Sequence, residues 1–288
     1  MKLLKTGFIL IALILIVGYV LLYVYNRINQ TNPAHIEPKK QNVLRIVTAN
    51  IQYRNQENNP QTTSLLSGLD ADVLIILEYT GSNLDLRQFE NSGYKTILDK
   101  PIQRSPHGIC AIIKENLEAE GLLIKTPFKS PCQMPFATIR VKMGNETVSV
   151  WGVHAPPPVP YCEFKTGPTI RDLSTYVSDG RLNKDLGVSR TGDLIVMAGD
   201  FNMFWFHPAF AQLKKSGLND CFASSHFLPS TTWSLFPWIP KFVGLDYIFC
   251  SRQFQIINSY MIKVKGSDHN CIITDIDLVK NLSDASIK

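Results

Sequence analysis

The sequence predicts an α/β fold, specifically a four-layer sandwich of two packed mixed β-sheets flanked by helices, preceded by one N-terminal transmembrane helix. Short apolar runs of strand length alternate with helical segments along the chain, an order typical of packed sheets with helices outside. Hydrophobic residues make up 45% and charged residues 18% of the chain, which is a globular rather than a disordered composition. A long uncharged run near the N-terminus stands apart from this pattern.

That run, residues 7–25, contains no charge and no proline. As a helix it extends roughly 28 Å, close to the hydrocarbon thickness of a bilayer. Lys2 and Lys5 precede it, so we expect residues 1–6 in the cytoplasm and the rest of the chain outside it, in the periplasmic or extracellular space. The alternative is a cleaved signal peptide, but the run exceeds a usual signal core and no A-x-A-like site follows Val24. The sequence thus favours a single-pass anchor whose partner is the lipid bilayer.

The remaining boundaries follow from composition. Residues 26–42 are polar and contain Pro33 and Pro38, so they are interpreted as a linker. Residues 43–279 form the predicted domain and residues 280–288 a C-terminal tail. The domain holds equal numbers of basic and acidic residues, so the formal net charge of +5 lies outside it, much of it near the membrane, where it can meet anionic headgroups. A neutral domain has no bulk electrostatic attraction to nucleic acid.

Within the domain, apolar runs predict strands over residues 43–49, 73–77, 136–142, 146–153, 193–198, 246–251 and 271–276. The run at 73–77 is continuously apolar, as in a strand buried on both faces. A Gly-Asn turn joins 136–142 to 146–153 and indicates a hairpin. Helices are predicted over 168–178 and 208–216, each opened by a proline suited to the first turn.

None of the six cysteines forms a C-x-x-C pair, which argues against a zinc knuckle or a thioredoxin-like site. Cys132 and Cys162 lie in Pro-flanked, loop-like segments and are the best candidates for a disulfide in an oxidising compartment. Cys110, Cys250 and Cys271 fall in apolar strand-like runs, where buried free thiols are expected.

A repeated pattern suggests the chemistry: an apolar strand ends, and a polar, chemically capable residue follows or lies next to the strand. The residues concerned are Asn50, Glu78, His154, Asp200, Asn202, Asp246, Asp268 and His269. Strand ends gathered at one edge of a sandwich bring such groups together. Carboxylates with Asn and His, and no thiolate cluster, suit a hard cation such as Mg²⁺ or Mn²⁺, which can neutralise phosphate charge.

The ordered set of motifs, an Asn, a Glu, a His, GDFN, D-Y-I and SDH, resembles the deoxyribonuclease I-like endonuclease/exonuclease/phosphatase superfamily. The resemblance covers residues 43 to about 278, and GDFN followed by SDH is its most specific part. The apolar segment and the His-Ala-Pro-Pro-Pro stretch are similar to membrane-bound bacterial members, some of which are linked to lipid-pyrophosphate chemistry.

The resemblance implies a role for each residue. Glu78 would be the principal metal ligand, with Asn50 and Asp268. Asp200 would orient or deprotonate the attacking water and Asn202 would hold a phosphate oxygen. His269 would contact the phosphoryl group, oriented by Asp246, and His154 would be a second phosphate contact or general acid. The reaction implied is in-line attack of water on phosphorus, with Mg²⁺ or Mn²⁺ as cofactor.

One expected group is missing. In the nuclease branch a carboxylate from the middle of the chain supports the first histidine, and we place no such residue here. The segment RSPHG offers Arg104, a candidate phosphate contact, and His107, which is better explained as a loop residue. This gap argues against a strict nuclease assignment.

Aromatic and other apolar residues near the motifs bear on the substrate. Trp233, Phe236, Trp238, Ile239 and Phe242 precede Asp246, and Phe204, Trp205 and Phe206 follow the GDFN motif. They either fill the core between sheet and helix or form an apolar rim, including Trp238, that meets lipid or stacks against a base. The expected substrate is a phosphate ester, either nucleic acid or lipid-linked, and no obligate protein partner is implied. The alternatives are a non-specific endonuclease, a lipid or lipid-pyrophosphate phosphatase, and a non-catalytic binding module of the same fold.

Overall fold

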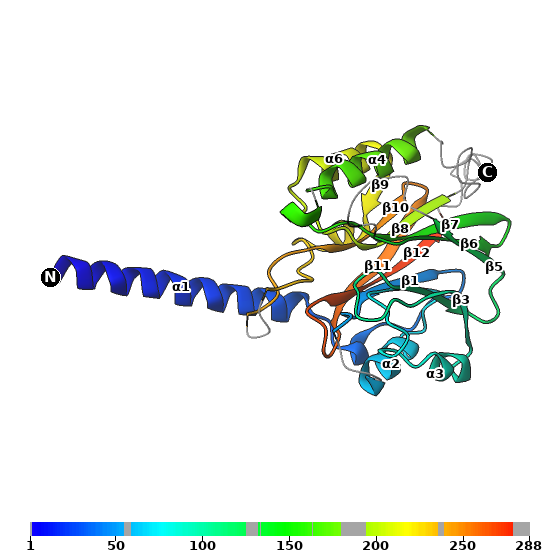
Figure 1. Cartoon of the computed structure of the whole chain (residues 1–288), viewed down its shortest axis with the longest axis horizontal. Helices are drawn as coiled ribbons and strands as arrows, with labels where there is room; N and C mark the ends of the chain where they lie inside the picture. The colour runs from blue at the N-terminus through cyan, green and yellow to red at the C-terminus, as the bar shows by residue number, and fades with distance from the viewer. Residues whose placement is uncertain are drawn as a thin grey trace, which may run out of the picture.

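The structure is a computed structural model that describes residues 2–54, 59–124, 132, 134–162, 164–179, 194–235 and 239–278. It confirms the predicted four-layer sandwich: two six-stranded mixed sheets pack face to face with helices on both outer sides (Figure 1). The first sheet contains, in spatial order, β11 (Phe254–Lys263), β12 (Asn270–Leu278), β1 (Leu44–Asn50), β2 (Val73–Leu77), β4 (Ile109–Lys114) and β3 (Tyr94–Lys100). The second contains β5 (Ala119–Ile124), β6 (Phe136–Met143), β7 (Glu146–His154), β8 (Leu194–Asp200), β10 (Asp246–Ser251) and β9 (Leu218–Asp220).

Each sheet has one parallel pair at its centre. In the first sheet β1 runs parallel to β2, with Asn50 opposite Leu77. In the second sheet β7 runs parallel to β8, with His154 opposite Asp200. Because parallel strands end at the same edge, these two pairs deliver their last residues to one edge of the sandwich.

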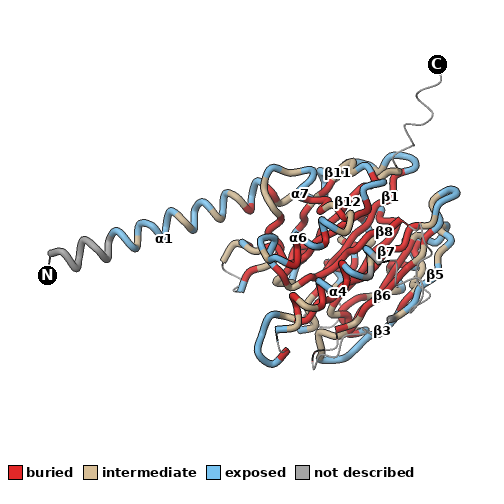
Figure 2. Tube along the Cα trace, turned by 90° about the horizontal axis from the view of Figure 1, so that it is seen from above, coloured by how far each residue is buried: buried red, intermediate tan, exposed pale blue. Residues whose placement is uncertain are grey.

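Apolar side chains from the facing sides of both sheets, such as Ile46, Ile75, Val150 and Val196, form the central core. A second cluster lies between the first sheet and the helices α2 (Pro60–Ser67) and α3 (Leu86–Asn91). A third lies between the second sheet and the helices α4 (Thr166–Asp179) and α6 (Pro208–Lys215). The short elements η1 (Pro33–His35), η2 (Pro160–Cys162) and α7 (Cys221–Ser225) complete the described elements. Figure 2 shows the resulting buried interior of the sheets.

The helix α1 (Lys2–Asn29) projects away from the sandwich, and its described residues are largely exposed (Figures 1 and 2). Its Leu10–Asn29 part is long and apolar enough to cross a membrane, by length and composition. The helix outlasts the apolar run of residues 7–25, because its last turn docks on the domain. The Tyr25 hydroxyl donates to Pro229 O and Asn26 Nδ2 to Lys241 O. The first residues of the predicted linker are therefore helical and attached.

The segment that follows α1 also lies against the domain rather than standing clear of it. Thr31 N donates to Met261 O at 2.8 Å, and Glu37 O accepts from Arg45 Nη2 at 2.8 Å. Lys39 forms an ion pair with Asp72 at 2.5 Å. The predicted disulfide is confirmed, since Cys132 and Cys162 are bonded, and Cys110, Cys250 and Cys271 are buried free thiols as expected.

Candidate active site

Strand ends position the predicted polar residues at one edge of the sandwich. Asn50, His154 and Asp200 are the last residues of β1, β7 and β8, and Asp246 is the first residue of β10. Asp246 pairs with Asp200 across antiparallel strands, so Asp200 has His154 on one side and Asp246 on the other. Gly199 permits this close approach, because a Cβ there would lie 1.8 Å from Val153 O.

Glu78 follows β2 immediately and adopts the left-handed backbone region, with φ of 58°. Its carboxylate accepts hydrogen bonds from Asn50 Nδ2 at 3.0 Å and from Tyr53 N at 2.9 Å. Burial raises the pKa of Glu78, and the nearby charge of Asp268 raises it further, against the lowering effect of these hydrogen bonds. An unusual backbone conformation at a non-glycine residue is typical of functional sites.

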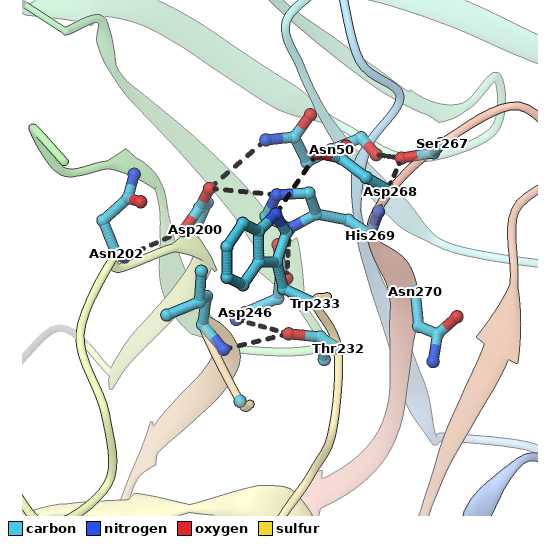
Figure 3. Close-up of polar contacts among 12 residues, drawn as sticks. Asn50, Asp200, Asn202, Thr232, Trp233, Asp246, Ser267, Asp268, His269 and Asn270 are labelled. Carbon is cyan, nitrogen blue, oxygen red and sulfur yellow. Dashed lines mark hydrogen bonds and ion pairs between the residues drawn. The ribbon is translucent and has the colours of Figure 1, made fainter. Parts of the chain in front are cut away.

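Asp200 is the centre of the cluster (Figure 3). Its Oδ2 accepts from Asn50 Nδ2 at 3.2 Å and lies 3.9 Å from the Nε2 atoms of both His154 and His269. Burial and the charge of Asp246 raise the pKa of Asp200 to about 8. Three chain segments thus direct polar groups at one carboxylate oxygen.

His269 and Asp246 form a tight pair, with Nδ1 of the imidazole 2.7 Å from Oδ2 of the carboxylate. Burial alone would lower the pKa of His269, but Asp246 and Asp200 outweigh it and raise the pKa to about 9. The hydroxyl of Thr232 accepts from Asp246 N at 3.0 Å and fixes the start of β10 (Figure 3). The Nε2 atom of His269 is left facing Asp200.

His154 has a different environment. It is fully buried, and burial lowers its pKa to about 3, so the ring is neutral at ordinary pH. Among the described residues its Nδ1 has no hydrogen-bond partner. This agrees with the sequence, in which we place no carboxylate that supports the first histidine.

Asp268 and Asn202 complete the predicted set. Asp268 Oδ2 accepts from Trp233 Nε1 at 3.2 Å, and the backbone of Trp233 bridges to His269. Asn202 has left-handed φ of 47°, and its backbone N donates to Asp200 Oδ1 at 2.8 Å. Its side-chain Nδ2 donates to Ala155 O at 2.9 Å, so its Oδ1 is not used by these contacts.

One predicted substrate contact, Arg104, lies outside this cluster. Arg104 is exposed, with left-handed φ of 57°, in the loop between β3 and β4. Hydrogen bonds of Ile102 N to Tyr79 O and of Tyr79 N to Gly108 O hold that loop next to Glu78. Trp238 lies outside the described residues.

The structure adds residues that the sequence did not indicate. The Thr232 hydroxyl accepts a hydrogen bond from Asp246 N. Ser267 Oγ donates to Asn50 O at 2.6 Å and accepts from His269 N at 3.0 Å. Lys241 is buried, and its Nζ donates to Ser267 O at 3.3 Å. Burial lowers the pKa of Lys241 to about 7, against the charges of Asp268 and Asp246.

The donor chemistry of the cluster fits a hard divalent cation. Asp200, Asp246 and His269 offer ligand atoms that all lie within 4.8 Å of one another. Burial raises the pKa values of Glu78 and Asp200, and the neighbouring carboxylates Asp268 and Asp246 add to the effect. A bound cation would favour the charged form of both groups. The oxygen-rich set, without thiolates among the cluster residues, is the kind that Mg²⁺ and Mn²⁺ prefer.

A sequence profile of the Endonuclease/Exonuclease/phosphatase family matches residues 47–269, a span that contains every residue of the cluster. The chain belongs to the endonuclease/exonuclease/phosphatase family. Its members include phosphodiesterases, nucleases and phosphatases, generally dependent on a divalent metal. A comparison of this chain with curated protein sequences found no match.

Solved structures share the fold of this endonuclease/exonuclease/phosphatase family protein at low sequence identity. The human Nocturnin catalytic domain with bound sulfate is 16% identical, with TM-score 0.59, over 84% of this chain and 97% of that one. D. rerio TDP2 in complex with a single-strand DNA product is 13% identical, with TM-score 0.62, over 82% and 99%. A family protein from Leptotrichia buccalis C-1013-b is 17% identical, with TM-score 0.59, over 82% and 100%.

Proposed function

We propose that this protein is a divalent-metal-dependent phosphoesterase that hydrolyses phosphate ester bonds by in-line attack of water, outside the cytoplasm and next to the membrane. The observation that carries the proposal is the convergence on Asp200 of Asn50, His154 and His269, residues from three separate strand ends. At an ordinary strand end a carboxylate points into solvent, because burying a charge without compensating partners is costly. The burial of Asp200 among these groups is therefore better explained by a functional role.

In this proposal Asn50, Glu78 and Asp268 hold Mg²⁺ or Mn²⁺. When bound, the ion would neutralise phosphate charge and stabilise the leaving oxygen. We assign the ion to these residues rather than to the Asp200, Asp246 and His269 group because Asp246 and Asp200 raise the pKa of His269 to about 9, and a protonated imidazole does not bind a metal ion. A histidine held in this way is suited to contact a phosphoryl group instead.

The chain's own groups then bind and orient the reactants. Asp200 accepts a proton from the attacking water or orients it, because hydrogen bonds from Asn50 Nδ2 and Asn202 N hold its carboxylate at the centre of the cluster. His269, with its raised pKa, donates to a phosphoryl oxygen, and Asn202 holds another oxygen. His154 is neutral, so it contributes a hydrogen bond to the phosphoryl group but no positive charge.

The docked helix supports a location at the membrane. The hydrogen bonds from Tyr25 to Pro229 and from Asn26 to Lys241 tie the end of α1 to loops of the domain. A segment that is removed as a signal peptide has no need of such contacts. We infer that α1 is retained as a single-pass anchor, with its N-terminus in the cytoplasm.

An endonuclease is the second candidate, because the chain shares its fold with TDP2 in complex with single-strand DNA. Exposed Trp205 and Phe206 could stack against bases. The equal numbers of basic and acidic residues in residues 43–279 weigh against it, because non-specific binding to nucleic acid depends on net positive charge.

Hydrolysis of bis(p-nitrophenyl) phosphate by the full chain in detergent tests the proposal. We expect turnover with Mg²⁺ or Mn²⁺ that EDTA abolishes and added metal restores. Glu78→Gln should lower kcat/KM at least about a hundredfold, since a bound metal ion supplies several kcal/mol of charge stabilisation. The matched control is Glu90→Gln, at an exposed position on α3, which should leave the rate unchanged. Full activity in Glu78→Gln, or no metal-stimulated hydrolysis by the wild type, would overturn the proposal. Nicking of plasmid DNA at a higher rate would favour the endonuclease.

A further inference from the structure

A cavity of about 380 Å³ lies where α1 meets the domain. Its wall combines Leu22 and Tyr25 of the helix with the aromatic side chains of Phe204, Trp205, Phe206 and Phe242. Its volume falls in the range of sites that bind small molecules. The cavity is thus shared between the proposed membrane anchor and two loops of the catalytic domain.

The aromatic side chains of this wall are unusually exposed. Phe206 is 67%, Trp205 55% and Phe242 42% exposed. Three of the rings pack on each other, with Phe204 stacked on Phe206 at 5.3 Å and Trp205 edge-on to Phe206 at 5.5 Å between ring centroids. A cluster of exposed apolar side chains beside an anchor marks a surface that meets lipid or an apolar ligand.

The helix fixes the depth of the cavity relative to the bilayer. Leu22 and Tyr25 lie in the last turn of the apolar run of residues 7–25, where a crossing helix leaves the hydrocarbon. The Tyr25 hydroxyl bonds to Pro229 O, so helix and loop cannot separate without breaking this contact. Figure 1 shows the loops that precede β10 reaching the end of α1. The wall of the cavity that Leu22 and Tyr25 form therefore lies at the level of the membrane surface.

The same loops connect the cavity to the cluster around Asp200. Thr231 and Gly244 line the cavity, while the adjacent Thr232 accepts a hydrogen bond from Asp246 N at 3.0 Å. Thr232 N also donates to Val243 O at 2.8 Å. On the other loop, Phe204 follows Asn202 by two residues. Residues that line the cavity are thus next to, or two positions from, residues of the Asp200 cluster on both loops.

We propose that this cavity receives the hydrocarbon chain of a membrane-embedded phosphate ester, so that the substrate of this protein is a phosphate-bearing lipid presented by the bilayer. The inference rests on the proposed phosphoesterase function and specifies its substrate class. The apolar wall fits a hydrocarbon chain, and the position of this wall at the level of the bilayer surface lets a lipid keep the rest of its chain in the membrane while its phosphate reaches Asp200 and His269.

The test is a series of alkyl p-nitrophenyl phosphates, from methyl to dodecyl, hydrolysed by the full chain with Mn²⁺ in detergent of constant composition. The reacting group is identical throughout, so only the chain varies. We expect kcat/KM to rise at least about tenfold from methyl to dodecyl, because burial of as few as two methylene groups corresponds to this factor. Phe206→Ser and Phe242→Ser should each reduce the dodecyl-to-methyl ratio of kcat/KM severalfold. Phe227→Ser is the matched control, because Phe227 is fully exposed and is not part of the cavity wall.

The possible outcomes distinguish failure of the phosphoesterase function from failure of the lipid cavity. No hydrolysis of even the methyl ester would reject the phosphoesterase function itself. Hydrolysis of all esters with a ratio near one, or a ratio that Phe206→Ser leaves at the wild-type value, would reject the lipid cavity alone. Preferred cleavage of a single-stranded oligonucleotide, lost in Phe206→Ser, would assign the aromatic rings to base stacking and also overturn the inference.

Discussion

His269 Nδ1 lies 2.7 Å from Oδ2 of Asp246, and this pair is buried beside Asp200. The second oxygen of Asp246 is buried without a hydrogen-bond partner among the described residues. The carboxylate of Asp246 therefore interacts with His269 rather than with the surrounding backbone. It fixes the orientation of the imidazole and favours its protonated form.

Asp246→Asn should reduce kcat on a phosphodiester by about a hundredfold or more, the usual range for loss of a general acid or base. The asparagine keeps the shape of the side chain but removes the charge that raises the pKa of His269. Steady-state kinetics would measure the effect, with Asp277→Asn near the far end of β12 as the control. Wild-type kcat in Asp246→Asn would show that His269 needs no carboxylate.

Asp220 should make the protein less stable as pH rises. Burial raises the pKa of Asp220 to about 6 from 3.8, so the folded state binds more protons than the unfolded state between these values. The contribution of protonated Asp220 to the free energy of unfolding is fully present below about pH 4 and is lost as the pH rises through about 6. Asn is an equally good helix N-cap, so Asp220→Asn keeps the bond to Ala223 N and should raise the free energy of unfolding at pH 7 by up to about 3 kcal/mol.

Urea unfolding at pH 4 and pH 7 would measure this difference. The control is Asp85→Asn, which replaces the partly exposed N-cap aspartate of α3 and should give no comparable gain at pH 7. Equal stability of Asp220→Asn and wild type at both pH values would refute the assignment.

The bond between Cys132 and Cys162 should stabilise the fold. It closes a loop across a sequence separation of 30 residues, and loops of this length correspond to about 2–4 kcal/mol. The double variant Cys132→Ser, Cys162→Ser should unfold at a lower Tm, and dithiothreitol should lower the Tm of the wild type but not of the variant. Six free thiols in the unreduced, denatured wild type would contradict the bond.

The orientation of the chain has its own test. A reporter fused after Lys288 should be active only outside the cytoplasm, because Lys2 and Lys5 favour a cytoplasmic N-terminus. A reporter active only inside the cell would remove the basis for both the orientation and the oxidising environment of the disulfide.

The seven strands that the sequence predicted are interior strands of the sheets. The strands it did not predict are the four edges, β11, β3, β5 and β9, and the interior strand β4, where it indicated only an apolar, strand-like run around Cys110. Interior strands such as β2 are buried along their whole length, which produces continuous apolar runs. Edge strands have one open side, and β3 and β11 mix buried with exposed positions, so their sequences lack a clear period. Their strand state depends on the neighbour they join.

In the site, too, some residues were predictable from the sequence and others were not. Asn50, Glu78, His154 and Asp200 were predictable because strand ends in a sandwich share an edge. Thr232, Ser267 and Lys241 were not, because their roles arise from loops whose positions depend on tertiary contacts with β10 and β12. The docking of α1 on the domain was also not predictable, since Asn26 indicates only polarity and its partner lies 215 residues away.

The central claim is that Glu78, Asp200, Asp246, Asp268 and His269 form one site for a cation and a phosphate. Isothermal titration of the full chain with Mn²⁺ tests it without relying on any substrate. We predict saturable binding that Glu78→Gln weakens by at least about 10–100-fold, as expected when a metal site loses a ligand or its support, and that Glu90→Gln leaves unchanged. Equal Mn²⁺ affinity in the wild type and Glu78→Gln would contradict the account.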